Sequence, residues 1–140
     1  MAKNLKLTAS LVKKNQLIRL LKIKGVKRFN KKALEKLSYE LEKKAEDITV
    51  LDMRGIVNFC DFFVIASGLV DRHVRAIAQG ILEGLEKPGL KPWHTEGEGQ
   101  AQWILLDFGD CVVHIFEKSI RDFYDLEYLW QDAPRVALKR

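Results

Sequence analysis

The sequence contains little cysteine and no long hydrophobic run. Cys60 and Cys111 are too few for a disulfide framework or a cysteine-only zinc site. Both lie in apolar stretches typical of strands, where a cysteine is usually a buried, reduced thiol. No apolar run approaches the roughly 18 residues of a membrane span, and the N-terminus lacks the features of a secretory signal. We therefore expect a soluble protein in a reducing compartment, a bacterial-type cytoplasm, with an organelle matrix as the alternative.

Acidic residues are absent from the first 32 positions. These positions hold eleven Lys and Arg, which leaves 13 of the 24 basic residues and all 19 acidic residues to the remainder. The net charge of +5 thus combines a basic extension with an acidic body. Three interpretations of the extension stay open: a solvated arm, an organellar targeting sequence, or an arm that contacts nucleic-acid phosphates. For the last, the candidate nucleic-acid-binding residues are Lys13, Lys14, Arg19, Lys22, Lys24, Lys27 and Arg28.

Complete catalytic motifs are also missing. The tripeptide from Asp107 to Gly109 matches the magnesium-binding motif of kinases, but the catalytic and Gly-rich loops of that fold do not accompany it. The pair Gly97 and Gly99 has no third glycine at the dinucleotide-binding spacing. The three histidines show no metal-ligand spacing, and neither cysteine has an activating signature. We expect no catalytic residue, no metal site and no cofactor.

The clearest structural signal is the stretch from Trp103 to Phe116, in which two apolar runs flank Gly109 and Asp110. The glycine suits a tight turn, and the β-branched and aromatic residues suit strands, so the stretch predicts a β-hairpin at the heart of a sheet. Alternation gives this hairpin one wholly apolar face and one mixed face. The mixed face carries Trp103, Leu105, Asp107, Val112, His114 and Phe116. We expect the apolar face on the core and the mixed face in water or against a partner.

The remaining signals alternate between helix and strand. Apolar residues at helical spacing predict helices from residue 33 and over 74–85, and a capping box at 119–122 predicts the start of the last helix or helix pair. Strands are expected at 47–52, 61–66 and 90–94, with a polar loop at 95–100 and the ordered part closing at Pro134. These elements predict an α/β domain with a mixed five-stranded sheet and flanking helices. The expected boundaries are 1–32 for the basic N-terminal extension, 33–133 for the domain and 134–140 for a C-terminal tail.

Six blocks of the chain carry a family resemblance. They are Asp61-Phe-Phe-Val-Ile-Ala-Ser-Gly68, Arg72-His-Val74, Glu96-Gly-Glu98, Ala101-Gln-Trp-Ile-Leu-Leu-Asp-Phe-Gly-Asp110, Val112-Val-His114 and Tyr124-Asp-Leu-Glu-Tyr-Leu-Trp130. In order and spacing they resemble the Iojap-related ribosomal silencing factors, the RsfS family. The resemblance covers residues 33–131 and nothing in residues 1–32, so it leaves the role of the extension open.

The resemblance implies a fold similar to nucleotidyltransferases, used for binding and not for catalysis. Family members bind large-subunit ribosomal protein fourteen and sterically keep the small subunit from joining, which represses translation when nutrients are short or assembly is incomplete. Two other classes stay open: a nucleotidyltransferase-like enzyme, and a general RNA-binding protein that acts through its basic arm. For a silencing factor, the basic arm is a candidate for contact with ribosomal RNA. Nucleotidyl transfer needs converging carboxylates after a Gly-Ser turn, whereas Ser67 and Gly68 stand here in the reverse order.

We expect the partner to contact the mixed face of the hairpin. An apolar centre and an acidic rim would select a basic protein, with Trp103, Leu105, His114 and Phe116 in the centre and Glu98, Asp107 and Asp110 in the rim. The alternative for the tryptophan is a place in the core, and for the acids a plain surface charge. An exposed aromatic face would also favour a homodimer of the free protein at high concentration.

Two further groups of residues have alternative interpretations. Arg72 and His73 belong either to a helix surface or to a support for the polar loop. Tyr124, Tyr128 and Trp130 either extend the partner surface or pack against the sheet, and their helical spacing favours packing.

Overall fold

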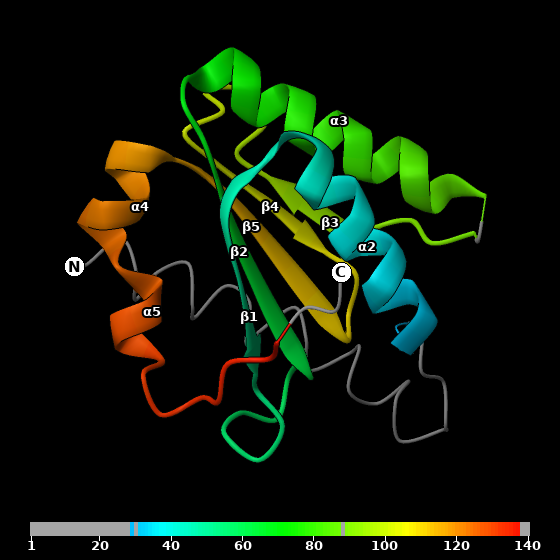
Figure 1. The fold of residues 1–140 in the computed structure, drawn as a ribbon, viewed down its shortest axis with the longest axis vertical. Helices are drawn as coiled ribbons and strands as arrows, with labels where there is room; N and C mark the ends of the chain where they lie inside the picture. Colours follow the sequence, from blue (N-terminus) through cyan, green and yellow to red (C-terminus); the bar gives the residue numbers. More distant parts are fainter. Residues whose placement is uncertain (1–28, 30, 88, 138–140) are drawn as a thin grey trace.

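The computed structural model describes residue 29, residues 31–87 and residues 89–137. Predictions for the N-terminal extension, including its seven candidate nucleic-acid-binding residues, lie outside the described residues. Within the described part, four helices and five strands follow one another (Figure 1). In chain order they are α2 (Lys31–Lys44), β1 (Glu46–Asp52), β2 (Phe62–Gly68), α3 (Asp71–Glu86), β3 (His94–Glu96), β4 (Trp103–Asp107), β5 (Cys111–Glu117), α4 (Lys118–Tyr124) and α5 (Leu126–Leu129).

The five strands form one mixed sheet in the order β1-β2-β5-β4-β3. Strands β2 and β5 pair in parallel, and the other three pairs are antiparallel. The parallel pair is possible because α3 carries the chain from the end of β2 across the sheet before the β3–β4–β5 meander begins. The predicted α/β class with a mixed five-stranded sheet is confirmed, and the likeness to nucleotidyltransferases stays a prediction.

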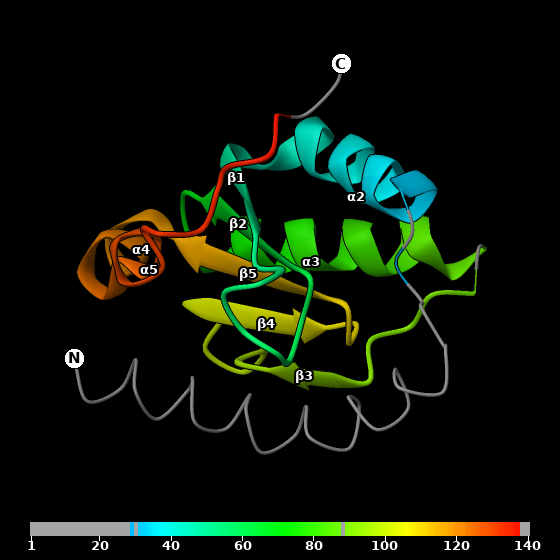
Figure 2. The ribbon, with the colours of Figure 1, turned by 90° about the horizontal axis from the view of Figure 1, so that it is seen from below.

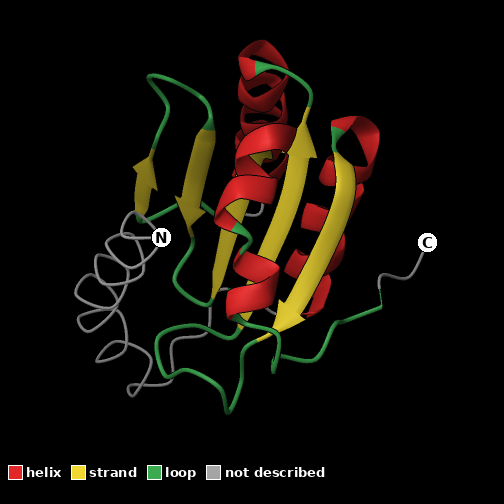
Figure 3. Ribbon diagram, turned by 90° about the vertical axis from the view of Figure 1, so that its left-hand side faces the viewer, coloured by secondary structure: helices red, strands yellow, loops and turns green. Residues whose placement is uncertain are grey.

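Both faces of the sheet are covered, each by a different layer. Helices α2 and α3 lie side by side on one face (Figure 2), where the apolar side of α3 packs on side chains such as Val64, Ile104 and Ile115. The other face carries a second cluster, in which Phe63 and Phe116 meet the loop at 53–60 and α5. Figure 3 shows α4 and α5 in front of the central strands and the two longer helices behind them.

The predicted β-hairpin forms with the expected alternation of side chains. Trp103 stands opposite Phe116, and Leu105 stands opposite His114. The turn closes with a hydrogen bond from the Phe108 N–H to the Cys111 carbonyl, and its first central residue, Gly109, has a φ of 91°. A residue with a side chain rarely adopts that conformation, which explains why a glycine stands at this position of a two-residue hairpin loop.

Several predicted boundaries are wrong. The short strand lies at His94–Glu96 and not at 90–94, because pairing with β4 places Glu96 opposite Leu105 and so draws the start of the polar loop into the sheet. The capping box does not form, since Ser119 Oγ donates to Glu117 and no side chain caps α4. The packed domain also extends past Pro134, as the next section of chain bonds to β1.

Phe29 belongs to the folded domain, although it precedes the predicted boundary at residue 33. Its ring is 4% exposed and lies 5.2 Å from the ring of Phe108, between centroids. Its N–H donates a 3.0 Å hydrogen bond to Asp110 Oδ2 at the β4–β5 turn. The core contacts of the domain therefore begin before α2.

Candidate functional site

The mixed face of the hairpin, proposed above as the partner surface, is buried. Leu105, His114 and Phe116 are each 1% exposed or less. The loop at 53–60 and α5 cover them, because that loop contributes Met53 and Phe59 to the cluster while the C-terminal segment contributes Leu126 and Ala133. The prediction that this face is exposed is therefore wrong, and the apolar centre of the predicted interface is a second hydrophobic core.

Trp103 lies at the margin of this second core and is half-buried. Its ring centroid is 4.6 Å from that of Phe116 and 4.7 Å from that of Tyr124. Its indole Nε1–H donates a 3.1 Å hydrogen bond to His114 Nδ1. These contacts fix the indole within the fold, so shortening this side chain would disturb packing as well as any surface that it forms.

His114 is a core histidine. Burial among aromatic rings, with Phe63 at 4.8 Å between centroids, lowers its pKa to about 3 because the charged imidazolium would lose its hydration. The neutral ring accepts at Nδ1, so its proton is on Nε2, and no hydrogen bond from the described residues reaches that atom. The ring is therefore uncharged at physiological pH and positions Trp103.

The predicted acidic rim is not brought together at a surface. Asp107 and Asp110 are buried. Asp107 Oδ1 accepts from the Gly109 N–H at 2.8 Å within the hairpin turn, and the carbonyl of Asp110, a central residue of that turn, accepts from the N–H of Asp61 at 2.7 Å. Glu98 is exposed, but it lies beyond the opposite end of β4, where Thr95 Oγ1 donates to it at 2.6 Å. The structure therefore separates the rim into two turn-forming residues and one surface charge.

The start of α3 shows which basic residues support its neighbours. His73 Nδ1 accepts from the Leu69 N–H, and Nε2 lies 2.7 Å from the Lys44 carbonyl, so this ring joins α3 to the end of α2. Arg72 is exposed. The polar loop is held instead by Arg75, whose Nη2 donates to the Gly99 carbonyl at 2.7 Å, and no sequence motif singled out that residue.

A different surface is available for a partner, and it lies on α4 and α5. Phe123 and Tyr128 are each 67% exposed, and Leu129 is 43% exposed. Exposed acids occur in the same short segment. We use the name α4–α5 surface for six exposed residues: Asp122, Phe123, Asp125, Tyr128, Leu129 and Asp132. Large exposed apolar side chains beside a group of exposed acids, here with one exposed base, Lys118, at the start of α4, are typical of a protein interaction site.

Sequence patterns did not predict the α4–α5 surface, because the helix expected in this part of the chain is interrupted. In a continuous helix, Tyr124 and Tyr128 would share one face. Asp125 instead adopts a left-handed conformation with a φ of 48°, which ends α4 and starts α5 in a new direction. Tyr124 and Trp130 pack against the second core as predicted, whereas packing is wrong for Tyr128, which faces solvent.

Arg121 fixes the α4–α5 segment to the sheet. This side chain is 8% exposed, and its Nε donates to Glu127 Oε1 at 2.8 Å. Its Nη1 donates to the Asp47 carbonyl and to Ser67 Oγ, and its Nη2 donates to Thr49 Oγ1. One guanidinium therefore connects α4, α5, β1 and β2, which gives the α4–α5 surface a defined position.

The described residues were also searched for a reactive cysteine, a metal site and a membrane-spanning helix. Both cysteines are buried, and loss of hydration raises the pKa of Cys111 well above its usual value, so its thiol stays protonated. Among the described residues, no group of three or more His, Cys, Asp and Glu could hold a metal ion. The same part of the chain contains no helix long and apolar enough to span a membrane.

A family model and individual relatives of known name all relate this chain to ribosomal factors. The family model described as "Ribosomal silencing factor during starvation" matches residues 27–140. The ribosomal silencing factor RsfS of Bacillus subtilis is 45% identical over 97 residues, which cover 69% of this chain and 82% of that protein. The mouse protein named "Mitochondrial assembly of ribosomal large subunit protein 1" is 32% identical over 92 residues, covering 64% of this chain and 40% of its own length.

Solved structures agree with the sequence matches. A crystal structure of a Bacillus halodurans protein superposes with a TM-score of 0.69 at 38% identity, covering 78% of this chain and all of that one. A crystal structure of a Chromobacterium violaceum protein gives a TM-score of 0.66 at 30% identity, covering 74% of this chain and 87% of that one. The match of the family model over most of the chain, with relatives of this similarity, shows that the chain belongs to the ribosomal silencing factor (RsfS) family.

Proposed function

We propose that this protein binds protein fourteen of the large ribosomal subunit and sterically prevents the small subunit from joining, and so represses translation when nutrients are short or assembly is incomplete. Membership of the silencing factor family supports this role. The names of the relatives agree, since they describe ribosomal silencing and, for the mouse protein, assembly of the large subunit in mitochondria.

The main support for the proposed binding surface is the exposure of two aromatic side chains on the α4–α5 surface. Phe123 and Tyr128 provide large apolar contact areas, and aromatic anchors dominate the binding energy of many interfaces. The neighbouring acids Asp122, Asp125 and Asp132 would attract a basic ribosomal protein and exclude acidic competitors. Of the residues predicted from sequence, Trp103 and Glu98 remain proposed contacts, while the buried members act by supporting the fold.

The test is a double substitution, Phe123→Ser with Tyr128→Ser, measured by calorimetry against isolated protein fourteen. We expect affinity to fall at least about thirtyfold, because two exposed anchors worth roughly 1–2 kcal/mol each are removed. Inhibition of subunit joining should decrease in parallel. The melting temperature should change little, since both side chains already face water.

Tyr39→Ser is the matched control, because Tyr39 is 58% exposed on α2, over the other face of the sheet. It should leave both binding and subunit joining unchanged. Equal binding by the double variant and the wild type would show that the partner uses another surface. Absence of wild-type binding to protein fourteen would overturn the proposed function itself.

We further propose that the protein is not an enzyme. The relatives are named as silencing or assembly factors. The carboxylate of Asp107 is buried and bonded to the turn, which is a structural use of that group. Purified protein should therefore hydrolyse or transfer no nucleoside triphosphate, with or without divalent metal. Turnover that is present in the wild type and lost in Asp107→Asn, with the fold retained by circular dichroism, would contradict this proposal.

We also propose that the free protein forms a homodimer, but through a different surface from the one expected from the sequence. The aromatic sheet face that was expected to drive it is covered. The α4–α5 surface is the exposed apolar area that could replace it, so the double variant above should reduce any self-association seen by light scattering at high concentration.

A further inference from the structure

Helices α4 and α5 are too short to hold a fixed direction by themselves. They contain seven and four residues, and isolated helices of fewer than about 12 residues are marginal in water. The left-handed residue Asp125 separates them, so no continuous helix fixes the angle between the two. Tyr124 and Leu126 attach the segment to the second core, but apolar contacts have little directional preference. The direction of α4 and α5 therefore depends on polar contacts.

The side chain of Arg121 makes these polar contacts. It is 8% exposed, and its five N–H groups form a rigid planar fork. Towards α5, its Nε–H donates to Glu127 Oε1 at 2.8 Å. Towards the sheet, Nη1 donates to Ser67 Oγ at 2.8 Å and to the Asp47 carbonyl, and Nη2 donates to Thr49 Oγ1 at 3.3 Å. One planar group thus holds α4, α5 and the sheet at fixed angles to one another.

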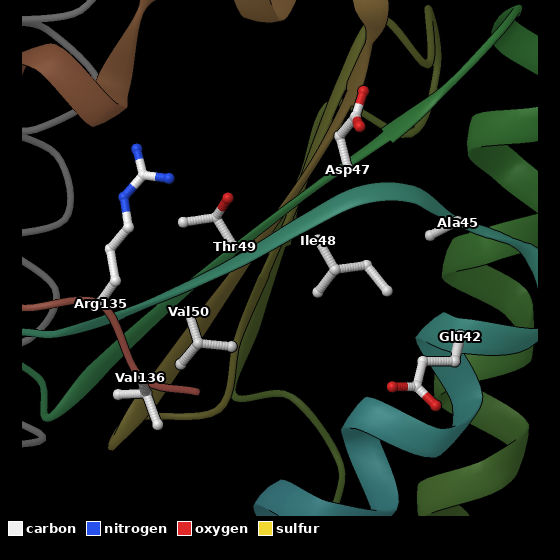
Figure 4. A pocket seen from close by; sticks show the side chains of 8 residues that line it. All are labelled: Glu42, Ala45, Asp47, Ile48, Thr49, Val50, Arg135 and Val136. Atoms are coloured by element: carbon white, nitrogen blue, oxygen red, sulfur yellow. The ribbon is translucent and has the colours of Figure 1, made fainter. Parts of the chain in front are cut away.

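Strand β1 is shaped to receive this guanidinium group. Its register with β2 is irregular between Glu46 and Thr49. Within this bulge Asp47 adopts a left-handed conformation with a φ of 50°, and its carbonyl accepts from Arg121. Figure 4 shows Thr49 and Arg135 on the same side of β1. Two of the four acceptors of the guanidinium thus lie in or beside a bulge, a feature that is common beside functional sites.

Glu127 is held from a second direction. Its Oε2 lies 3.6 Å from Nη2 of Arg135, in the C-terminal stretch that pairs with β1. The side chain of Arg135 is 68% exposed, whereas that of Arg121 is 10% exposed. Exposed ion pairs contribute little, so Arg121 is the main partner of this carboxylate. A substitution of Arg121 nevertheless leaves Glu127 with a basic neighbour.

Both aromatic anchors of the α4–α5 surface lie next to this contact in the chain. Phe123 follows Arg121 by two residues in α4, and Tyr128 directly follows Glu127 in α5. The bond between Arg121 and Glu127 therefore determines where Phe123 lies relative to Tyr128.

We propose that Arg121 is a positioning residue for partner binding, which holds Phe123 and Tyr128 at the separation that the partner requires without touching the partner itself. This inference rests on the proposed function of the α4–α5 surface. A surface that is ordered before binding loses less conformational freedom on association. Affinity should therefore depend on a side chain that is buried beneath the surface.

The first test measures positioning without a partner. The three tyrosines of the full chain are replaced by 3-fluorotyrosine and followed by fluorine NMR. Arg121→Lys keeps the charge but loses the planar fork, so the Tyr128 signal should broaden or split as α5 samples more than one orientation. The signal of Tyr39, which lies on α2, should stay the same. An unchanged Tyr128 signal would overturn the proposal.

The second test is a double-mutant cycle against isolated protein fourteen. Arg121→Lys should weaken binding at least fivefold, at a temperature where circular dichroism shows that the fold is retained. In the background of Phe123→Ser with Tyr128→Ser, the same change should cost less than twofold, because positioning has no effect once the anchors are absent. Equal costs in the two backgrounds would show that Arg121 acts through general stability, which would overturn the proposal.

Two further variants keep the result specific to Arg121. Arg54→Lys is the matched control, because Arg54 also bonds to a carboxylate, with 2.8 Å between Nη2 and Asp52 Oδ2, but lies in the loop at 53–60. It should change neither the Tyr128 signal nor the affinity, and a change as large as that of Arg121→Lys would overturn the assignment. If Arg121→Lys does not fold, Thr49→Val removes one acceptor with little change of shape and should weaken binding about twofold in the same cycle.

Failure of the positioning role and failure of the proposed function give different results. Binding of Arg121→Lys with the affinity of the wild type would overturn the positioning role and leave the proposed function in place. Absence of wild-type binding to protein fourteen would overturn both, whatever the fluorine signal of Tyr128.

Discussion

At the scale of single residues, His114 makes stability depend on pH. The folded state holds the pKa of this imidazole at about 3, whereas in the unfolded state the pKa lies near the ordinary histidine value of 6.5. Above pH 6.5 the ring is neutral in both states, so it contributes no pH dependence. As the pH falls below 6.5, the unfolded state binds a proton that the folded state excludes, and the free energy of unfolding decreases.

The expected loss between pH 7.5 and pH 5 is about 2 kcal/mol from this residue, since each pH unit below the unfolded pKa costs about 1.4 kcal/mol. Urea denaturation at the two pH values measures it. His114→Gln removes the titrating group, so the variant should lose about 2 kcal/mol less over the same interval than the wild type. Equal losses in both proteins would show that the imidazole is protonated within the fold.

At the scale of elements, the β3–β4 connection depends on one glycine. Gly97 has a φ of 83°, and a Cβ built there would lie 1.8 Å from the Trp103 carbonyl oxygen, which is backbone and cannot move aside alone. Gly97→Ala should therefore destabilise the domain by roughly 2–4 kcal/mol through strain and displacement of β4. The free energy of unfolding in urea measures this effect.

Gly99 provides the control within the same loop. It lacks a left-handed φ, and nothing lies within 4 Å of a Cβ placed there. Its carbonyl remains available to Arg75 after substitution, so Gly99→Ala should change stability by less than about 0.5 kcal/mol. Similar costs for the two variants would indicate that the loop rearranges freely and that the contact with Trp103 is unimportant.

The sequence predicted elements well where a local pattern determines them. The hairpin at Gly109 and the helix α3 follow from turn chemistry and apolar spacing, and both form as expected. The predictions that failed concern which elements pack over each face of the sheet. Alternation identified the mixed face of the hairpin, but it could not show that α5 and the loop at 53–60 fold over Leu105 and Phe116, because those contacts join residues far apart in the chain.

The expected exposure of the candidate site was wrong for the same physical reason, together with one local departure from helical geometry. Burial turned Asp107 and Asp110 from a predicted rim into parts of a turn. The left-handed residue Asp125 then rotated Tyr128 away from the face that helical spacing had assigned to it. Asp adopts this conformation more readily than most residues, but nothing in the sequence marks Asp125 among the other acids as the one that does.

At the scale of the whole molecule, the division of charge along the chain predicts that partner choice and affinity depend on different parts of it. The first 32 residues carry eleven basic residues and no acid, whereas the α4–α5 surface is acidic and aromatic. An acidic surface suits a basic ribosomal protein, and a basic extension suits RNA phosphates. We therefore expect the extension to strengthen binding to the whole large subunit without affecting recognition of isolated protein fourteen.

A variant lacking residues 1–26 tests this division, since it keeps Phe29 and its contact with Phe108. Affinity for isolated protein fourteen should match that of the full chain. Affinity for whole large subunits, measured across a salt series, should show a shallower slope of log K against log salt. Each lost phosphate contact should flatten that slope by about 0.7 to 0.9, because fewer counterions are released on binding. If the truncated protein keeps the full slope, residues 1–26 do not contact ribosomal RNA; if it loses affinity for the isolated protein as well, these residues take part in choosing the partner.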